Sequence, residues 1–453
     1  MKVKYTAIYL LLVTNLFVNL PLLPQTGKRF PSERKVIKDP VTGTELVFLT
    51  STPAGDRKIY PTHNQWTSDG EWLIFSSGRV KGEALAVNEK TGIMVQVTEG
   101  GYRSMLLVAR KSMKLYYMRK PEGFAARGAR EITEVDLASL FANSEAGALK
   151  NASSYQRICG RIPPELQARG NMALDGSEEW IWFQVGKSTA MQHLPEGTEI
   201  EPDFGPRNMG AGPGGIAGMN IHTGEIKYVV SVPFQVGHIQ SNPWIPGQII
   251  FCWETGGKAP QRTWIVNSDG SGLRPLYPES DYEWVTHEAV ISPEEVAFSI
   301  MGHRKIPVTS ADTPAEHTPA DNANPGQEPE WGISGTRLKP TGLGIVNINT
   351  REMIIAGQIP FGSGFWHVTG SSDGRFVAGD NFARDIYLID RHTHEMMLLS
   401  TGHKTTAADH PHPTFSPDGT KIEIQSAMLS EDGRSMNICI IPIPEEWLKR
   451  QYK

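Results

Sequence analysis

Alternating hydrophobic and polar residues follow a short turn signal at seven places along the chain. Each signal combines residues such as Ser, Asp, Pro and Gly, and the segment after it is rich in aliphatic and aromatic residues. This pattern predicts a tight turn followed by a half-buried β-strand. The seven strands are expected at residues 71–75, 114–117, 180–183, 249–251, 296–298, 376–378 and 422–424.

A second turn signal follows several of these strands, for example at 88–92, 267–270 and 390–393. Two hairpins per repeat make a four-stranded antiparallel blade. Seven such blades predict an all-β fold, a seven-bladed β-propeller, whose sheet edges are short and protected. The strand at 44–50 precedes the first repeat, and we expect it to close the ring as the outer strand of the last blade.

The repeats predict one propeller domain over residues 27–453. Their spacing is uneven, which indicates insertions in the longer intervals. Residues 307–335 are rich in Pro, Ala, Asn, Thr and Glu and are expected to form a long loop. Two further insertions are expected at 119–169, where 133–148 is interpreted as partly helical, and at 187–215.

The first residues have the pattern of a secretory signal peptide. Two lysines precede an apolar run that extends to Leu23, which predicts a signal peptide over residues 1–25 and a periplasmic or secreted protein. No other stretch is long and apolar enough to span a membrane. The formal net charge of −5 does not support a nucleic-acid partner. The three cysteines lie far apart, which excludes a disulfide framework and favours buried thiols.

Six of the thirteen histidines fall in a short window ahead of the turn signals. In a propeller the first strand of each blade lines the central channel, whose mouth is the usual binding place. We therefore expect these side chains to converge there from several blades, and Arg103 holds the comparable place in the second repeat. The six are His63, His238, His287, His367, His410 and His412.

A cluster of neutral imidazoles suits a transition metal such as Mn²⁺ or Zn²⁺, and an imidazole also serves as a general base near neutral pH. The sequence has no G-x-S-x-G elbow, no P-loop and no H-E-x-x-H. These absences argue against a serine peptidase, a P-loop nucleotide hydrolase and a zincin. Arg103 and Arg304 could hold carboxylates or sulfates through two hydrogen bonds each.

Several stretches resemble oligogalacturonate lyases. They are residues 27–32 with 39–45, the Gly-His pair at 237–238, Thr-His-Glu at 286–288, and His-Pro-His-Pro at 410–413 followed by Phe-Ser-Pro-Asp. Members of that family are seven-bladed propellers that cleave oligogalacturonates by β-elimination. The resemblance implies a lyase with a histidine base and a Mn²⁺ ion.

Carried over residue by residue, the resemblance implies that His238 is the base. It implies that His287, His410 and His412 bind the metal, with Zn²⁺ and Ca²⁺ as alternatives to Mn²⁺. The family's glutamine ligand is expected at position 407, where this chain has Ala407, and the family's substrate-binding arginine of blade four has no clear match. The remaining candidates are interpreted as substrate-binding residues: His63, Arg103, Arg304 and His367.

These observations predict a metal-assisted lyase acting on an anionic, uronic-acid oligosaccharide, with no nucleic-acid partner and no membrane contact beyond the signal peptide. Two alternatives remain open. One is a lyase of sulfated uronans, of the ulvan or glycosaminoglycan type, on the same fold. The other is a non-catalytic, TolB-like binding propeller, which fits the repeats and the signal peptide but not the placement of the histidines.

Overall fold

The structure of the protein is a computed structural model. It describes residues 25–123, 128–203, 209–257, 259–279, 283–302, 342–359 and 364–452. The expected signal peptide, apart from its last residue, lies outside the described residues, as do Arg304 and the expected loop at 307–335.

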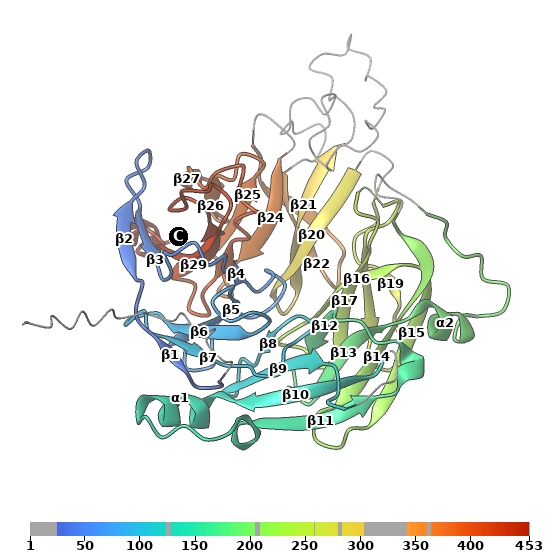
Figure 1. Cartoon of the computed structure of the whole chain (residues 1–453). Coiled ribbons are helices and arrows are strands. Elements are labelled where there is room, and N and C mark those ends of the chain that lie inside the picture. The colour runs from blue at the N-terminus through green and yellow to red at the C-terminus, as the bar shows by residue number, and fades with distance from the viewer. Residues whose placement is uncertain are drawn as a thin grey trace, which may run out of the picture.

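Seven antiparallel sheets form a ring, so the predicted seven-bladed β-propeller is confirmed (Figure 1). Blade one contains β4 (Arg57–Lys58), β5 (Trp72–Ser76), β6 (Ala84–Asn88), β7 (Met94–Gln96) and β1 (Arg29–Phe30). Blade two contains β8 (Leu107–Val108), β9 (Lys114–Arg119), β10 (Arg130–Asp136) and β11 (Gln156–Ile162). Blade three contains β12 (Met172–Leu174), β13 (Trp180–Val185), β14 (Ala211–Asn220) and β15 (Ile226–Phe234).

Blades four to seven follow in chain order around the ring. Blade four contains β16 (Val236–Ser241), β17 (Gln248–Trp253), β18 (Thr263–Asn267) and β19 (Arg274–Pro275). Blade five contains β20 (Glu283–Ser292), β21 (Glu295–Gly302), β22 (Gly342–Asn347) and β23 (Met353–Gly357). Blade six contains β24 (Phe365–Gly370), β25 (Phe376–Asn381), β26 (Ile386–Asp390) and β27 (Met396–Ser400). Blade seven contains β28 (Thr414–Phe415), β29 (Lys421–Ser426), β30 (Asn437–Pro442), β3 (Glu45–Phe48) and β2 (Lys35–Lys38).

The seven strands predicted after the turn signals are the second strands of the seven blades: β5, β9, β13, β17, β21, β25 and β29. Their apolar side chains fill the layers between neighbouring blades, and Phe75, Phe183, Phe251, Phe298 and Phe376 are completely buried. Each such phenyl group contributes about 1.5–3 kcal/mol by its removal from water. The three cysteines are free and buried, as expected.

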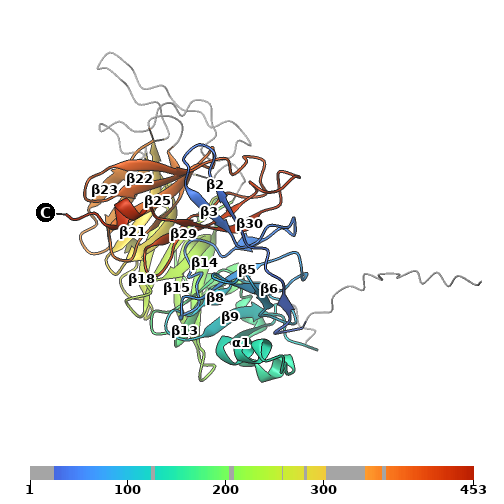
Figure 2. The ribbon, with the colours of Figure 1, turned by 90° about the vertical axis from the view of Figure 1, so that its left-hand side faces the viewer.

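The ring is closed by strands from both ends of the chain. Val47 and Phe48 of β3 pair with Ile440 and Cys439 of β30. The expected closure at 44–50 is therefore confirmed, with one addition: β2 pairs with β3 and forms the outermost strand of the blade. Figure 2 shows these N-terminal strands beside β30.

The insertion at 119–169 is partly helical within 133–148, as expected. Residues 133–136 continue β10, and helix α1 (Leu137–Glu145) begins only after Asp136, whose carboxylate accepts a hydrogen bond from the Ser139 backbone N–H. Such a side-chain cap satisfies one of the free N–H groups at a helix start. Phe141 of α1 stacks on Trp72 of blade one, with ring centroids 4.2 Å apart. The insertion at 187–215 contains helix α2 (Lys187–Gln192), and helix α3 (Glu445–Leu448) follows blade seven.

The inner strands of three blades are irregular at histidine positions. The pairing register shifts between Gly237 and Gln240 in β16, between Thr286 and Ala289 in β20, and between Phe365 and Val368 in β24. A bulge redirects a side chain that would otherwise follow the strand's alternation. Three histidines also have left-handed backbone conformations, with φ of 43° at His238, 53° at His287 and 55° at His412. Such strain concentrates at functional sites.

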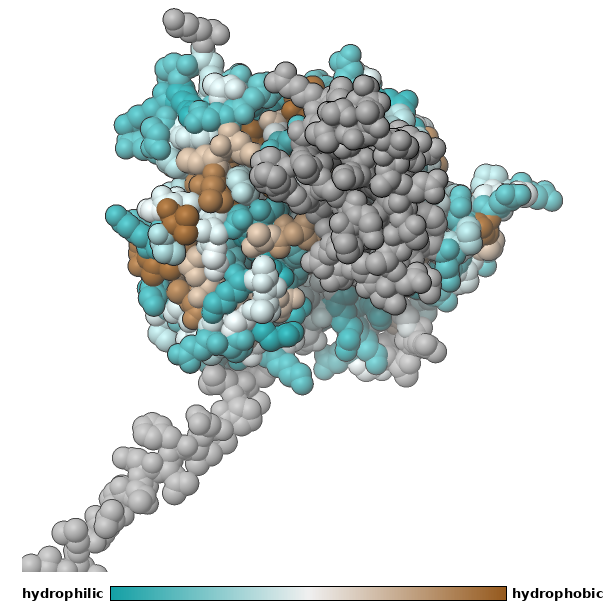
Figure 3. All heavy atoms as spheres, turned by 90° about the horizontal axis from the view of Figure 1, so that it is seen from above, coloured by the Kyte–Doolittle hydropathy of each residue, from teal (hydrophilic) through white to brown (hydrophobic). Residues whose placement is uncertain are grey.

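The outer surface is mixed in character. Among the described residues, no helix is both long and apolar enough to cross a membrane. Figure 3 shows the molecule from above, with hydrophilic residues and small groups of hydrophobic ones interspersed over the coloured part of that face.

Candidate active site

A cavity of about 670 Å³ lies where the inner strands begin, at one end of the central channel. That volume is within the range of about 300–1,000 Å³ that is usual for small-ligand sites. We call it the histidine cavity, because five of the predicted histidines line it. They are His238 of β16, His287 of β20, His367 of β24, and His410 and His412 from the segment before β28.

His238 lies between two glutamates. Its Nε2 is 3.4 Å from Glu254 Oε2, and its Nδ1 is 3.4 Å from Glu288 Oε1. Burial raises the pKa of Glu288, but the charges of Arg262 and His238 outweigh burial and lower it to about 2. Glu288 is therefore an ionised carboxylate behind the imidazole, and it stabilises a positive charge on that ring.

Asp380 of β25 holds the histidines of blades six and seven. Its fully buried carboxylate lies 3.2 Å from His367 Nδ1 and 3.5 Å from His410 Nδ1. It also accepts hydrogen bonds from the backbone N–H groups of His367, at 2.7 Å, and His412, at 3.4 Å. Burial raises the pKa of Asp380, but His367 and His410 outweigh this effect, and the pKa lies well below its usual range.

His287 completes the cluster on the side of blade five. The Tyr60 hydroxyl, which comes from blade one, is 2.7 Å from His287 Nδ1. Burial lowers the pKa of His287 well below its ordinary value, and the nearby imidazoles and Arg262 add to the effect. Burial also raises the pKa of Tyr60, with a smaller contribution from Glu288. At neutral pH His287 is therefore uncharged, and the Tyr60 phenol keeps its proton.

The donor set fits a divalent transition metal. Ligand atoms of His367, Asp380 and His410 lie within 4.8 Å of one another, and those of His238, Cys252 and Glu254 form a second such group. His410 Nδ1 is buried and makes no hydrogen bond among the described residues, although the Asp380 carboxylate faces it at 3.5 Å. Imidazole with carboxylate is a ligand combination that Zn²⁺, Mn²⁺ and Fe²⁺ accept. Of the three histidines that the resemblance assigns to the metal, His410 belongs to the group at Asp380, whereas His287 and His412 belong to neither group among the described residues.

Solved structures with the same architecture include two oligogalacturonate lyases. One, determined in complex with manganese, has a TM-score of 0.69 and 16% sequence identity, covering 94% of this chain and 100% of that one. The other, from Vibrio parahaemolyticus, has a TM-score of 0.68 and 17% identity, with the same coverage. This chain has the fold of the oligogalacturonate lyases. No protein-family model matches the sequence, and a search of the curated proteins finds no match either.

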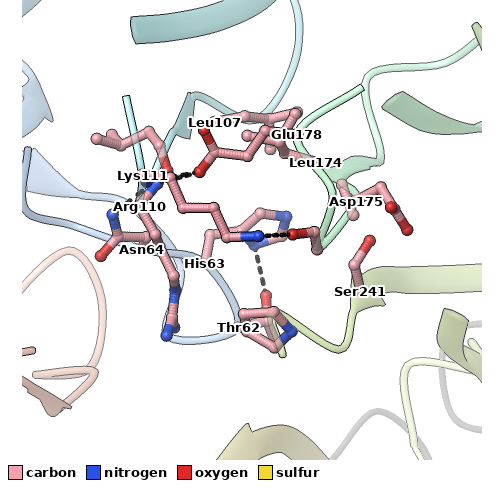
Figure 4. A pocket seen from close by; sticks show the side chains of 14 residues that line it. Thr62, His63, Asn64, Leu107, Arg110, Lys111, Leu174, Asp175, Glu178 and Ser241 are labelled. Atoms are coloured by element: carbon pink, nitrogen blue, oxygen red, sulfur yellow. Dashed lines mark hydrogen bonds between the residues drawn. The ribbon is translucent and has the colours of Figure 1, made fainter. Parts of the chain in front are cut away.

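Within the oligogalacturonate lyase fold, two of the predicted residues that the structure describes, Arg103 and His63, do not join the histidine cavity. Arg304 lies outside the described residues. Arg103 is exposed ahead of β8, and its backbone N–H bonds the Met118 carbonyl. His63 lines a small pocket with Arg110 and Lys111 instead (Figure 4), where its Nε2 lies 2.8 Å from the Met172 carbonyl oxygen.

The place of His63 has a local cause. Lys58 pairs with Phe75, and Trp66 forms a bridge with Leu73. Phe75 and Leu73 are two residues apart on β5, whereas their partners Lys58 and Trp66 are eight residues apart in the chain. Residues 59–65 therefore loop out of the strand pairing. Counting back from the turn signal cannot locate a side chain across such a loop. Tyr60, rather than His63, is the blade-one residue that reaches the histidine cavity.

Ala407, the residue at the expected glutamine position, is buried beside the cavity rather than in its lining, whereas the neighbouring Ala408 and Asp409 line it. Arg384 donates hydrogen bonds to the backbone carbonyls of Ala407 and Asp409, so it fixes this segment against blade six.

Several residues of the site were not identified from the sequence. Glu288 and Trp366 lie on inner strands beside His287 and His367, and the others come from second strands and connecting segments, where no repeat position marks them. A buried acidic or basic residue within an otherwise apolar strand is the one available signal, and Asp380 at the end of β25 shows it. The residues are Tyr60, Glu254, Arg262, Glu288, Trp366, Asp380, Phe382 and Arg384.

Proposed function

We propose that this protein is a polysaccharide lyase that cleaves uronic-acid oligosaccharides by metal-assisted β-elimination. The observation that carries the proposal is the presence of two chemically different histidine groups in one cavity. His238 stands between glutamates, and its ring centroid is 6.1 Å from that of His287, where the metal-type cluster begins. A base and a carboxylate-binding group must lie this close, because the proton removed in the reaction is on the carbon that bears the carboxylate.

The reaction breaks one C–H and one C–O bond. A base removes the C5 proton, the electron pair forms the C4=C5 double bond, and the bond from C4 to the glycosidic oxygen breaks, after which that oxygen takes up a proton. When bound, the metal would stabilise negative charge on the substrate carboxylate. His287, His410 and His412 are the residues that we propose hold it, in agreement with the sequence resemblance.

His238 accepts the C5 proton at Nε2 in this proposal. Glu288 lies behind the ring at Nδ1 and Glu254 lies beside Nε2, so both carboxylates stabilise the imidazolium that forms. Tyr60 is a neutral acid beside this base: its ring centroid is 5.1 Å from that of His238. Its raised pKa keeps the phenol proton available for the leaving oxygen.

The wall of the cavity suits a sugar ring. Trp366 and Phe382 line it with ring centroids 4.7 Å apart, and Trp366 also lies 4.4 Å from His287. Aromatic faces pack against the C–H surfaces of sugars, while carboxylates and hydroxyls turn to the polar groups. We also propose that the protein acts in the periplasm or outside the cell, on the basis of its first 25 residues.

Sulfated uronans form a second candidate substrate class. The closeness of Tyr60 to His238 supports them, because a His/Tyr pair can supply both the base and the acid of an elimination. The two candidate functions differ in the polysaccharide that is cleaved, while the β-elimination reaction is the same.

A lyase assay tests the proposal. The manganese-loaded protein is incubated with oligogalacturonates, ulvan and glycosaminoglycan oligomers, and the ultraviolet absorbance of the unsaturated product is followed. We expect one class to react, and we expect His238→Asn to lower kcat about 10²–10⁴-fold with an unchanged melting temperature. Asparagine is chosen because it tolerates the positive φ at this position.

His222→Asn is the matched control, because His222 is an exposed residue of an outer turn. It is expected to leave kcat unchanged. A metal-loaded protein that releases no unsaturated product from any of the three classes would refute the proposal, and so would an H238N variant with the turnover of the unmodified protein.

A further inference from the structure

We infer that His367 is a ligand of the divalent metal, and that Asp380 is a positioning residue that orients His367 and His410 toward it. The inference rests on the metal site of the proposed function, but it does not depend on the lyase reaction. It replaces the interpretation of His367 as a substrate-binding residue.

The first argument is position. The His367 ring lies at the centre of the cluster, with its centroid 4.2 Å from that of His287, 4.0 Å from that of His412 and 5.3 Å from that of His410. Nitrogen ligands about 2.1 Å from a tetrahedral metal lie roughly 3.4 Å from one another. The ring centroids lie about 1 Å beyond these nitrogens, so rings that meet at one ion have centroids roughly 5 Å apart. The separation of His367 from His410 is of this size, and His287 and His412 lie closer still, so His367 is next to all three proposed ligands.

The second argument is the hydrogen position that Asp380 imposes. An ionised carboxylate only accepts hydrogen bonds. Both Asp380 oxygens lie 3.2 Å from His367 Nδ1, and one lies 3.5 Å from His410 Nδ1. His367 therefore carries its hydrogen on Nδ1 and presents the lone pair of Nε2, and the nearby Asp380 charge favours the same arrangement in His410. Metal-binding histidines are held in this way by carboxylates in many proteins.

The third argument is burial. Only 4% of the His367 side chain is accessible, whereas 23% of the His238 side chain is. A residue that contacts substrate must present part of its surface to the cavity, as His238 does. His367 offers little beyond its ring edge, which is sufficient for one metal bond. Its backbone N–H is also fixed, since it donates to Asp380 Oδ1 at 2.7 Å.

Metal titration without substrate tests the inference. Chelator-treated proteins are titrated with Mn²⁺, and the free ion is followed by electron paramagnetic resonance. We expect His367→Gln to weaken Mn²⁺ binding at least 100-fold and Asp380→Asn to weaken it about 10–100-fold, as is usual for an outer partner of a ligand. His403→Gln is the matched control, because His403 is equally buried but bonds Ser400 and Ser426 instead.

A gain of signal provides a second test that does not depend on lost affinity. In His367→Cys, a thiolate replaces the imidazole. A thiolate that ligates Co²⁺ produces an intense charge-transfer band in the near ultraviolet, which the unmodified protein should lack. Thermal melting in chelator shows whether each variant is folded.

Two results would overturn the inference: a folded H367Q variant whose Mn²⁺ affinity is within threefold of the unmodified protein, or an H367C variant that binds Co²⁺ without the charge-transfer band. Neither the Mn²⁺ titration nor the Co²⁺ spectrum involves a substrate. A protein that binds metal through His367 but cleaves no uronide would therefore refute the lyase proposal and leave this inference intact.

Discussion

Lys58 and Glu423 form an ion pair near Thr414, and both side chains are wholly buried. Lys58 Nζ is 3.7 Å from Glu423 Oε2 and donates hydrogen bonds to the Ile59 carbonyl and the Thr414 hydroxyl. Neither carboxylate oxygen of Glu423 has a hydrogen-bond partner among the described residues. Burial raises the pKa of Glu423 to about 7 despite the opposing effect of Lys58. A buried pair with incomplete hydrogen bonding contributes little to stability, and its contribution depends on pH.

This pair makes a prediction about pH. The unfolded chain ionises Glu423 near its ordinary pKa of 4.5, whereas the folded protein retains the proton up to about 7. Glu423 therefore stabilises the fold below pH 4.5, and this stabilisation is lost as the pH rises through 7. In Glu423→Gln that loss should disappear. Urea unfolding at pH 5 and pH 7.5 should show a drop in the free energy of unfolding that is smaller by about 2 kcal/mol in the variant. Parallel curves for the two proteins would contradict the assignment.

A site residue could be predicted from the sequence where its distance from the following turn signal was regular. His238, His287, His367, His410 and His412 could be grouped because each precedes a turn signal by a similar number of residues. Tyr60 could not, since it reaches the cavity through a loop that sequence alone does not reveal. Asp380 lies on a second strand, so its approach to two histidines depends on how blades six and seven pack.

At the level of single elements, the turn signals were reliable because the information is local: each turn fixes the strand after it. The bulges at His238 and His287 were not predictable, since a register shift depends on the partner strand. The sequence pattern at 133–148 indicated a partly helical segment without giving the residue at which the helix begins, for a related reason. The sequence of residues 133–136 is compatible with a helix or a strand, and their pairing with β9 and β11 makes them a strand.

The closing strand β3 offers a test at this level. Phe48 is completely buried between blades six and seven and pairs with Cys439. Phe48→Ala should lower the free energy of unfolding by about 3–5 kcal/mol, because it leaves a cavity at the junction of the ring. Val36→Ala, on the partly exposed outer strand β2, should change it by less than about 1 kcal/mol. Equal effects in guanidinium unfolding would show that burial of Phe48 at the ring junction contributes no more to stability than the outer strand does.

On the scale of the whole molecule, the proposed metal would connect three blades. His287 belongs to blade five, His367 to blade six and His410 to the segment that enters blade seven. A ligand held by the folded state alone stabilises that state, by about 2.7 kcal/mol at a concentration 100 times its dissociation constant.

Removal of the metal should therefore lower the melting temperature by a few degrees, and Mn²⁺ should restore it. Differential scanning calorimetry with and without chelator measures this change. The H238N variant should show the same shift, because His238 is proposed to be the base. A melting temperature that does not respond to metal in either protein would argue against a site that spans the blades.

Ring closure also sets when the site can exist during folding. The paired residues Phe48 and Cys439 lie at opposite ends of the chain, and contacts between such distant positions form late. Closure brings Tyr60 of blade one against His412 of blade seven, with ring centroids 5.2 Å apart, and allows the Lys58 N–H to bond Gln425. We therefore expect a refolding chain to form most of its blades before it has a complete site. Recovery of metal binding then reports the final step of refolding, while circular dichroism reports the earlier growth of the blades.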